Sequence, residues 1–286
     1  MLDKISIGTA NFNYKYGLSN TLVSKKNINL IFKELKKQKI YNLDTAIDYN
    51  IHSRLPKKLN LINWKITSKI SNIKNKINNN KKIGTYLTSS IENHIKKLNI
   101  SKLDVLLLHQ TNDILFFKKE LYQELKNLKK INLINNFGYS IYDPIVLNEL
   151  ISKYPPDVIQ APFNIFDRRI YSSGWIKRLH NKKIKLQVRS IFLQGLLDSK
   201  ENQLIGFAKF NKHFKNFNQW LKKNDTNAID ASIAFIKKYD YIDKIVIGCE
   251  NLEQLRYNIE CFRKINMKIP RFLQVNDNKL INPTQW

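Results

Sequence analysis

Asp104-Val105-Leu106-Leu107-Leu108-His109 is a short apolar run that ends in a polar residue. Its length and composition are typical of a buried parallel strand, and His109 stands where the strand gives way to a loop. Asp44, Tyr49 and Lys69 have similar positions, each at or just after the end of a short β-like segment. If these strands are neighbours in a βα barrel, the four side chains meet at its C-terminal mouth, where barrel enzymes carry their chemistry.

Strand and helix signals alternate along the chain, which favours an α/β fold with parallel strands. The candidate strands are Ile5–Thr9, Leu43–Thr45, Trp64–Ser68, Val105–Leu108, Asn136–Ser140, Val158–Ala161, Lys185–Arg189 and Ile245–Ile247. In a chain of 286 residues this pattern predicts a (β/α)8 TIM barrel. We expect a single domain over residues 1–286, in which residues 266–286 form a C-terminal tail.

Simple features of composition restrict the class of protein further. The chain begins with a strand-like segment and without a long apolar stretch, so we expect no secretory signal. No apolar run approaches the ~18 residues that span a bilayer, so we expect no membrane association. Cys249 and Cys261 are too few for a metal cluster and make a poor disulfide framework. We therefore expect no metal site and a reducing, cytoplasmic location.

The formal net charge of +26 raises the hypothesis of a nucleic-acid partner. The lysines, however, are spread over nearly every expected helix and turn, and no nucleic-acid-binding motif accompanies them. We therefore interpret the charge as solvated surface in a lysine- and asparagine-rich chain, and we expect no nucleic-acid partner. The alternative is an electrostatic field that attracts an anionic substrate or cofactor.

Several segments resemble motifs of the aldo-keto reductase family, from about Ile5 to Asn258. Asp44-Thr45-Ala46-Ile47-Asp48-Tyr49 matches the family's Asp-Thr-Ala-x-x-Tyr motif in residue type and spacing. The segments that end in Lys69 and His109 match its lysine and histidine strands. Further similarities lie in Ile7–Ala10, Asn136–Ser140, Val158–Asn164, Arg189–Leu197 and Val246–Asn258. The resemblance implies a barrel that binds NADPH across its C-terminal mouth, without a Gly-rich fingerprint, and reduces the carbonyl group of a small molecule.

Four residues carry the chemistry that the resemblance implies. A tyrosine hydroxyl has a pKa of about 10, which is high for a proton donor at neutral pH. A cation nearby lowers that pKa, and Lys69 is expected to be this cation, held in place by Asp44. Tyr49 then protonates the developing alkoxide while the nicotinamide delivers hydride, and His109 orients the carbonyl oxygen.

The resemblance also implies a set of cofactor-binding residues. They are Thr9, Asp44, Ser140, Gln160, Phe163, Ser190, Phe192, Gln194, Gly195, Gly248, Glu250, Gln254 and Asn258. Ser140 and Gln160 are expected to hold the nicotinamide carboxamide, and Phe163 to stack on the ring. Backbone N–H groups at the start of the helix in Gly248–Asn258 offer a place for phosphate. Each expectation has an alternative. Phe163 is then a core residue, Gln160 makes only a hydrogen bond at the end of its strand, and the helix in Gly248–Asn258 is an ordinary capped helix that binds no phosphate.

Departures from the family pattern affect the choice of cofactor. Ile141 stands where the family usually has Asn, so one carboxamide contact is lost. Many NADPH-dependent members place Lys and Arg where this chain has Gly248 and Gln254. Glu250 disfavours a 2′-phosphate nearby, and Arg256 is a candidate to bind that phosphate in place of the missing Lys and Arg. We expect NADPH, with NADH as the alternative.

Substrate and biological role are less well determined by the sequence. Phe12, Tyr16, Trp175 and Trp286 are candidate pocket residues, with packing on the barrel as the alternative. Basic residues on the second and third connections favour an anionic or sugar-like carbonyl, unless they are simply solvated: Arg54, Lys57, Lys58, Lys74 and Lys76. The alternative to a carbonyl reductase is a nicotinamide-nucleotide-sensing regulatory or accessory protein with little turnover. The oligomeric state is not predicted.

Overall fold

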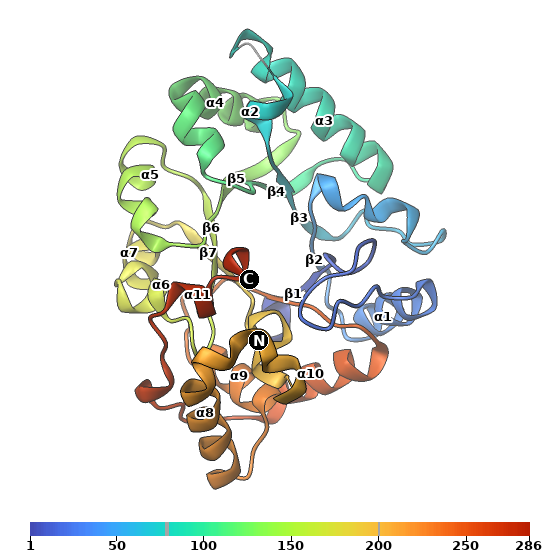
Figure 1. Ribbon diagram of the computed structural model, residues 1–286. Helices are drawn as coiled ribbons and strands as arrows, with labels where there is room; N and C mark the ends of the chain where they lie inside the picture. Colours follow the sequence, from blue (N-terminus) through green and yellow to red (C-terminus); the bar gives the residue numbers. More distant parts are fainter. Residues whose placement is uncertain (78–79, 200) are drawn as a thin grey trace.

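Eight parallel strands close into a barrel in the computed structural model, and helices surround this barrel (Figure 1). The structure describes residues 1–77, 80–199 and 201–286. The strands are β1 (Ile5–Gly8), β2 (Asn42–Asp44), β3 (Lys65–Ile70), β4 (Leu103–Leu108), β5 (Ile134–Ser140), β6 (Val158–Pro162), β7 (Lys185–Arg189) and β8 (Lys244–Ile247). Each strand pairs with the next along the chain, and β1 pairs with β8 to close the ring. The predicted (β/α)8 fold is therefore confirmed, and each predicted strand end lies within two residues of the observed one.

Most of the helices cover the outside of the barrel, while the last one lies at its C-terminal side. The helices are α1 (Lys25–Lys37), α2 (Ile73–Lys76), α3 (Ile83–Leu98), α4 (Asn112–Lys130), α5 (Leu147–Lys153), α6 (Arg169–Ser172), α7 (Trp175–Asn181), α8 (Asn211–Lys223), α9 (Ala228–Lys237), α10 (Leu252–Lys264) and α11 (Asn278–Ile281). Side-chain caps fix the starts of four of these helices: Ser24 accepts a hydrogen bond from the backbone N–H of Asn27 and Asn251 accepts one from Gln254, and Asn227 and Asp277 cap α9 and α11 in the same way. Within the described ranges, no helix is both long and apolar enough to cross a membrane.

Close packing of β5 against β6 explains one glycine. A Cβ atom added to Gly138 would lie 1.8 Å from the backbone oxygen of Val158, far inside van der Waals contact. Val158 itself faces the barrel interior, where it packs with Val105 and Leu107. Gly138 is therefore required for the two strands to pair at this point.

Strand alternation decides which side chains reach the barrel interior, because residues two apart share a face. On β6, Gln160 shares the inner face with Val158 and contacts Asp44 across the barrel. Phe163 comes three residues after Gln160 and lies outside the barrel. Its ring packs between those of Phe235 and Tyr239, with centroid distances of 4.9 and 4.8 Å.

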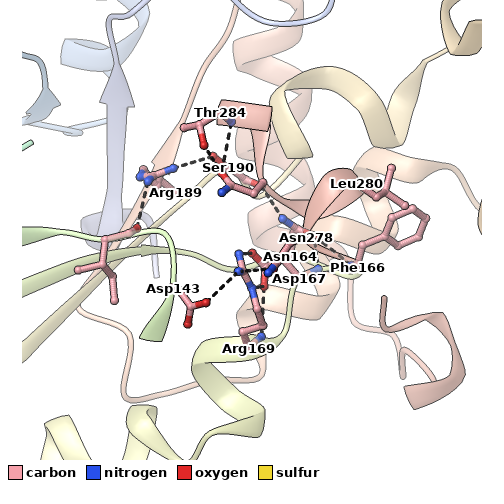
Figure 2. Close-up of polar contacts among 12 residues, drawn as sticks. Asp143, Asn164, Phe166, Asp167, Arg169, Arg189, Ser190, Asn278, Leu280 and Thr284 are labelled. Atoms are coloured by element: carbon pink, nitrogen blue, oxygen red, sulfur yellow. Dashed lines mark hydrogen bonds and ion pairs between the residues drawn. The ribbon is translucent and has the colours of Figure 1, made fainter. Parts of the chain in front are cut away.

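The end of the chain returns to the C-terminal side of the barrel, where it joins the loops after β6 and β7 (Figure 2). Arg169 binds the Asp167 carboxylate through Nε and Nη2, and its Nη1 donates to Asn278 of α11. Asn164 accepts hydrogen bonds from the backbone of this same loop and donates to the backbone oxygen of Ser190, directly after β7. The C-terminal segment thus supports the loops of the mouth.

Candidate active site

A cavity of about 850 Å³ occupies the C-terminal mouth of the barrel; we call it the mouth cavity. Residues at the ends of β1, β2, β3, β4, β7 and β8 line it, together with the start of α10. All four predicted catalytic residues, Asp44, Tyr49, Lys69 and His109, are among these lining residues. The neighbouring strand ends therefore bring the four side chains into one cavity.

Lys69 and Asp44 form a buried ion pair in the floor of the mouth cavity. Lys69 Nζ lies 2.5 Å from Asp44 Oδ1 and 3.0 Å from the backbone oxygen of Thr45, and both charged side chains are less than 10% exposed. The other carboxylate oxygen, Oδ2, accepts a hydrogen bond of 2.7 Å from Gln160 Nε2. Burial lowers the pKa of Lys69, and the Asp44 charge opposes this effect.

The polar network continues across the barrel below this pair. Gln160 Nε2 also contacts Gln187 Oε1 on β7, and Gln187 Nε2 contacts Thr67 Oγ1 on β3. Side chains from four strands are therefore joined in one layer, which holds the Asp44 carboxylate in a fixed orientation.

Tyr49 reaches the mouth cavity from a short turn after β2. The 3₁₀ turn Ile47–Tyr49 ends at Asn50, whose φ of 48° is left-handed, a conformation that Asn tolerates better than most residues. Lys69 Nζ lies 5.9 Å from the centroid of the Tyr49 ring. The two side chains are thus neighbours, without a direct hydrogen bond between them in the described structure.

The pKa of Tyr49 differs from the expectation that a cation makes this phenol acidic. Burial raises the pKa above its ordinary value, and the Asp44 carboxylate raises it further, while Arg189 lowers it in part. The cost of removing a phenolate from water outweighs the nearby positive charge. Tyr49 therefore keeps its proton at neutral pH, and its hydroxyl group can act as a proton donor.

His109 is neutral at physiological pH. Burial, assisted by the charge of Lys69, lowers its pKa to about 4. Its ring lies edge-on to that of Tyr49, with 6.1 Å between centroids, and both rings line the mouth cavity. A neutral imidazole carries one N–H donor, which suits a hydrogen bond to a carbonyl oxygen.

Nine of the predicted cofactor-binding residues besides Asp44 also line the mouth cavity: Thr9, Ser190, Phe192, Gln194, Gly195, Gly248, Glu250, Gln254 and Asn258. At the start of α10, two of the backbone N–H groups expected to bind phosphate already have partners, because Gln254 N donates to Asn251 and Glu250 N donates to the Gln254 side chain. Ser140, Gln160 and Phe163 are not lining residues.

Gln160 has an unused acceptor. It is fully buried, and its Oε1 has no hydrogen-bond partner in the described part of the chain. An unpaired buried amide oxygen is costly, so a ligand N–H that reaches it gains a hydrogen bond at little expense. The carboxamide of a nicotinamide ring has such an N–H group, so the unpaired oxygen fits the cofactor chemically; because Gln160 does not line the mouth cavity, the contact itself stays a prediction.

The expected stacking role of Phe163 is wrong. Its side chain is fully buried outside the barrel, and so it cannot present a ring face to a ligand in the mouth cavity. Ser140 is buried at the end of β5.

Of the four candidate pocket residues, only Tyr16 lines the mouth cavity. Phe12 is buried against Phe32, and Trp175 is buried on α7 beneath Arg178. The ring of Trp286 packs edge-on against Phe207 in the tail region. The expectation that these three side chains shape the pocket is therefore wrong.

The basic residues expected to select an anionic substrate do not line the mouth cavity either. Arg54 donates to the backbone oxygens of Phe12 and Val23, Lys76 pairs with Asp48, and Lys74 lies over an aromatic ring. Lys57 and Lys58 are exposed. These side chains therefore contact the protein itself or lie in solvent. The alternative interpretation, in which they do not select the substrate, agrees with this arrangement.

The structure adds residues that were not among the predicted site residues. Arg189 ends β7 and lines the mouth cavity, and its guanidinium carbon lies 4.2 Å from the centroid of the Tyr142 ring, which also lines it. The sequence did contain a signal for Arg189, because it is a polar residue at the end of a predicted strand, as are Lys69 and His109. Strand alternation from Gln187 would also have placed it on the inner face.

The mouth cavity also has acidic lining residues. Asp198, Glu250 and Glu253 line it, whereas Lys69 and Arg189 are the cationic lining residues in the described ranges. Arg256, the candidate to bind a 2′-phosphate, instead pairs with Glu34 at 2.9 Å and is not a lining residue.

The loop between β1 and α1 crosses over the mouth cavity. Leu18 N donates to the backbone oxygen of Gln194, and Ser19 Oγ donates to Glu250 Oε1. Gly17 has a φ of 73°, and a Cβ atom there would lie 3.1 Å from the Gln194 oxygen, so the crossing favours glycine at this position. The loop therefore forms part of the wall of the mouth cavity, through Tyr16, Gly17, Leu18 and Ser19.

Comparisons with known proteins agree with this architecture. The sequence profile of the Aldo/keto reductase family matches residues 4–276. Among curated proteins, the uncharacterized oxidoreductase YqkF of Bacillus subtilis (strain 168) is 23% identical over 185 residues, which are 61% of this chain and 60% of that protein. The similarity thus spans about 60% of the length of this relative.

Solved structures of this family have the same fold. The aldo-keto reductase AKR11C1 from Bacillus halodurans (holo form) superimposes with a TM-score of 0.70 at 16% identity, covering 94% of this chain and 89% of that one. The glycerol dehydrogenase AKR11B4 from Gluconobacter oxydans gives 0.65 at 15% identity, with 93% and 88% covered. Because the family profile spans nearly all of the barrel, this chain belongs to the aldo/keto reductase family.

Proposed function

We propose that this protein is a nicotinamide-dependent carbonyl reductase that converts an aldehyde or ketone into an alcohol. The observation that carries the proposal is the gathering of Tyr49, His109 and the buried Lys69–Asp44 pair in one cavity. A buried charged pair beside an un-ionised phenol and a neutral imidazole is an arrangement suited to proton donation onto oxygen.

The chain supplies the proton and the orientation of the substrate. The bound cofactor supplies hydride to the carbonyl carbon. The neutral His109 N–H donates a hydrogen bond to the carbonyl oxygen and fixes its position. As negative charge develops on that oxygen, the Tyr49 hydroxyl transfers its proton to it; an alkoxide is a stronger base than a phenolate, so this transfer is favourable even though burial raises the phenol pKa. Lys69 stabilises the charge that passes to Tyr49, and Asp44 and Gln160 hold Lys69 in place.

The preferred cofactor follows from the charge of the mouth cavity. The resemblance predicted NADPH, but Glu250 and Glu253 line the mouth cavity next to Gly248 and Gln254, the positions that the resemblance relates to the 2′-phosphate, and Arg256 is paired with Glu34. A phosphate dianion beside two carboxylates is repelled. We therefore favour NADH, with NADPH as the weaker cofactor.

The cofactor preference is tested by charge reversal. Glu250→Lys is expected to raise kcat/KM for NADPH about tenfold relative to NADH. Glu260→Lys is the matched control, because Glu260 is exposed on α10, pairs with Lys264 and does not line the mouth cavity. A wild-type protein that already prefers NADPH would refute this assignment.

The reductase itself is tested with a panel of aldehydes and ketones, by following the oxidation of NADH and NADPH. Turnover is expected in the wild-type protein, and Tyr49→Phe is expected to lose at least a hundredfold in kcat while binding the cofactor normally. Cofactor binding without turnover of any carbonyl compound would favour the nucleotide-sensing alternative. No binding of either nicotinamide cofactor would refute both.

Both cysteines are free thiols, in keeping with the proposed cytoplasmic location.

A further inference from the structure

We infer that Arg189 binds the carboxylate of the substrate, so that the preferred substrates are oxo acids: small carbonyl compounds that carry a carboxylate. The inference rests on the proposed reductase function and extends it to the class of substrate. It does not depend on the exposed lysines around the mouth, which do not line the mouth cavity.

Arg189 is a half-buried cation without an anionic partner in the described ranges. One N–H group donates to Ser190 Oγ at 3.3 Å, and another donates to the backbone oxygen of Ile141 at 3.1 Å. Both acceptors are neutral, and a guanidinium has five N–H donors in a planar fork that matches a carboxylate. A partly desolvated cation with spare donors is therefore available to an anionic ligand.

The structure holds this guanidinium in place. It lies over the Tyr142 ring, and the backbone oxygen of Arg189 accepts a hydrogen bond from Phe163 N. The next residue, Ser190, has a left-handed φ of 56° and is fixed by the Asn164 side chain, as Figure 2 shows. A non-glycine residue in this conformation persists only where its surroundings hold it. Arg189 is thus positioned before a ligand binds.

Arg189 lines the same cavity as Tyr49 and His109, and its charge acts on both side chains. In each case this charge lowers the pKa of the side chain. The Lys69 and Asp44 charges cancel as an ion pair and His109 is neutral, so Arg189 leaves one net positive charge at this end. A single carboxylate complements that charge.

The test compares two substrates of the same chain length, 4-oxobutanoate and butanal. In the wild-type protein, kcat/KM is expected to be about 10- to 100-fold higher for the oxo acid, the range of one charge-assisted contact. This ratio should fall to about one in Arg189→Met and partly recover in Arg189→Lys. Lys57→Met removes the same charge from an exposed site and should leave the ratio unchanged.

A binding measurement gives a second readout that does not need turnover. Succinate, which cannot be reduced, is titrated calorimetrically into the protein with NADH bound. Binding is expected to weaken at least tenfold in Arg189→Met, and Arg189→Gln, which retains a donor for the Ile141 oxygen, serves if the methionine variant unfolds. Turnover of butanal but an unchanged ratio in the variants would overturn the inference and leave the reductase intact.

Two further outcomes are decisive. If Arg189→Met weakens NADH as much as it weakens succinate, Arg189 serves the cofactor and the inference fails. If no carbonyl compound is reduced, the proposed function fails, while the loss of succinate binding still decides the role of Arg189.

Discussion

Lys69→Met tests the central electrostatic argument, since it removes the cation from a buried ion pair. Lys69 Nζ contacts Asp44 Oδ1 and the backbone oxygen of Thr45, and the Asp44 side chain is only 7% exposed. After substitution, Gln160 is the remaining described donor to this carboxylate. An uncompensated buried charge costs about 3–5 kcal/mol, which corresponds to a fall in Tm of roughly 10 °C.

The opposite substitution is expected to cost less. In Asp44→Asn the buried group left without its partner is the Lys69 ammonium, and burial already lowers its pKa, so it can lose its proton and become neutral. Loss of about 1–2 kcal/mol is therefore expected. In the double variant no buried charge remains, and its loss should be smaller than the sum of the two single losses by about 1–3 kcal/mol.

Urea unfolding followed by far-UV circular dichroism measures these differences, with Lys57→Met as an exposed control. Strict additivity of the two single substitutions would refute the reasoning, as would a Lys69→Met variant as stable as the wild type. Either result would mean that Asp44 does not depend on Lys69 for charge compensation in the folded protein.

Three further outcomes are expected. First, stability should fall as the pH decreases from about 6.5 to 4, because burial lowers the pKa of both His94 and His109 to about 4 and the unfolded chain binds these protons first. The slope should reach about 1.4 kcal/mol per pH unit for each histidine, and His94→Gln should remove about half of it in pH-dependent urea unfolding. Second, kcat for carbonyl reduction should show no step near pH 6.5, because His109 stays neutral there; a step at that pH would mean that its ring is solvated. Third, Gly138→Ala should lower stability by several kcal/mol or prevent folding, since its Cβ atom meets the Val158 oxygen; a thermal melt like that of the wild type would contradict this.

The strands, and the meeting of Asp44, Tyr49, Lys69 and His109 in one cavity, could be predicted because their signals are local. Each strand is a short segment with β-like composition between loop or helix signals, and the chain order fixes which strand ends are neighbours in a barrel. Lys69 is the last residue but one of β3 and His109 directly follows β4, so their place at the mouth needed no knowledge of the rest of the chain.

Other features depend on contacts between distant segments. The raised pKa of Tyr49 is set by burial under loops from several parts of the barrel, and the role of Arg256 is set by Glu34 on α1. The error at Phe163 had a different origin, because alternation from Gln160 already placed it on the outer face. The motif resemblance compares residue types, and it does not show on which side of the barrel wall the Phe163 side chain lies.

The contact between Arg169 and Asn278 has a practical consequence for handling this protein. Through it, α11 is connected to the loop network that includes Asn164 and reaches Ser190 beside the mouth. The N-terminus, in contrast, leads into the start of β1 at the opposite end of the barrel. Affinity tags and surface attachment therefore belong at the N-terminus, and a variant shortened before Asn278 should lose substrate discrimination before it loses its barrel.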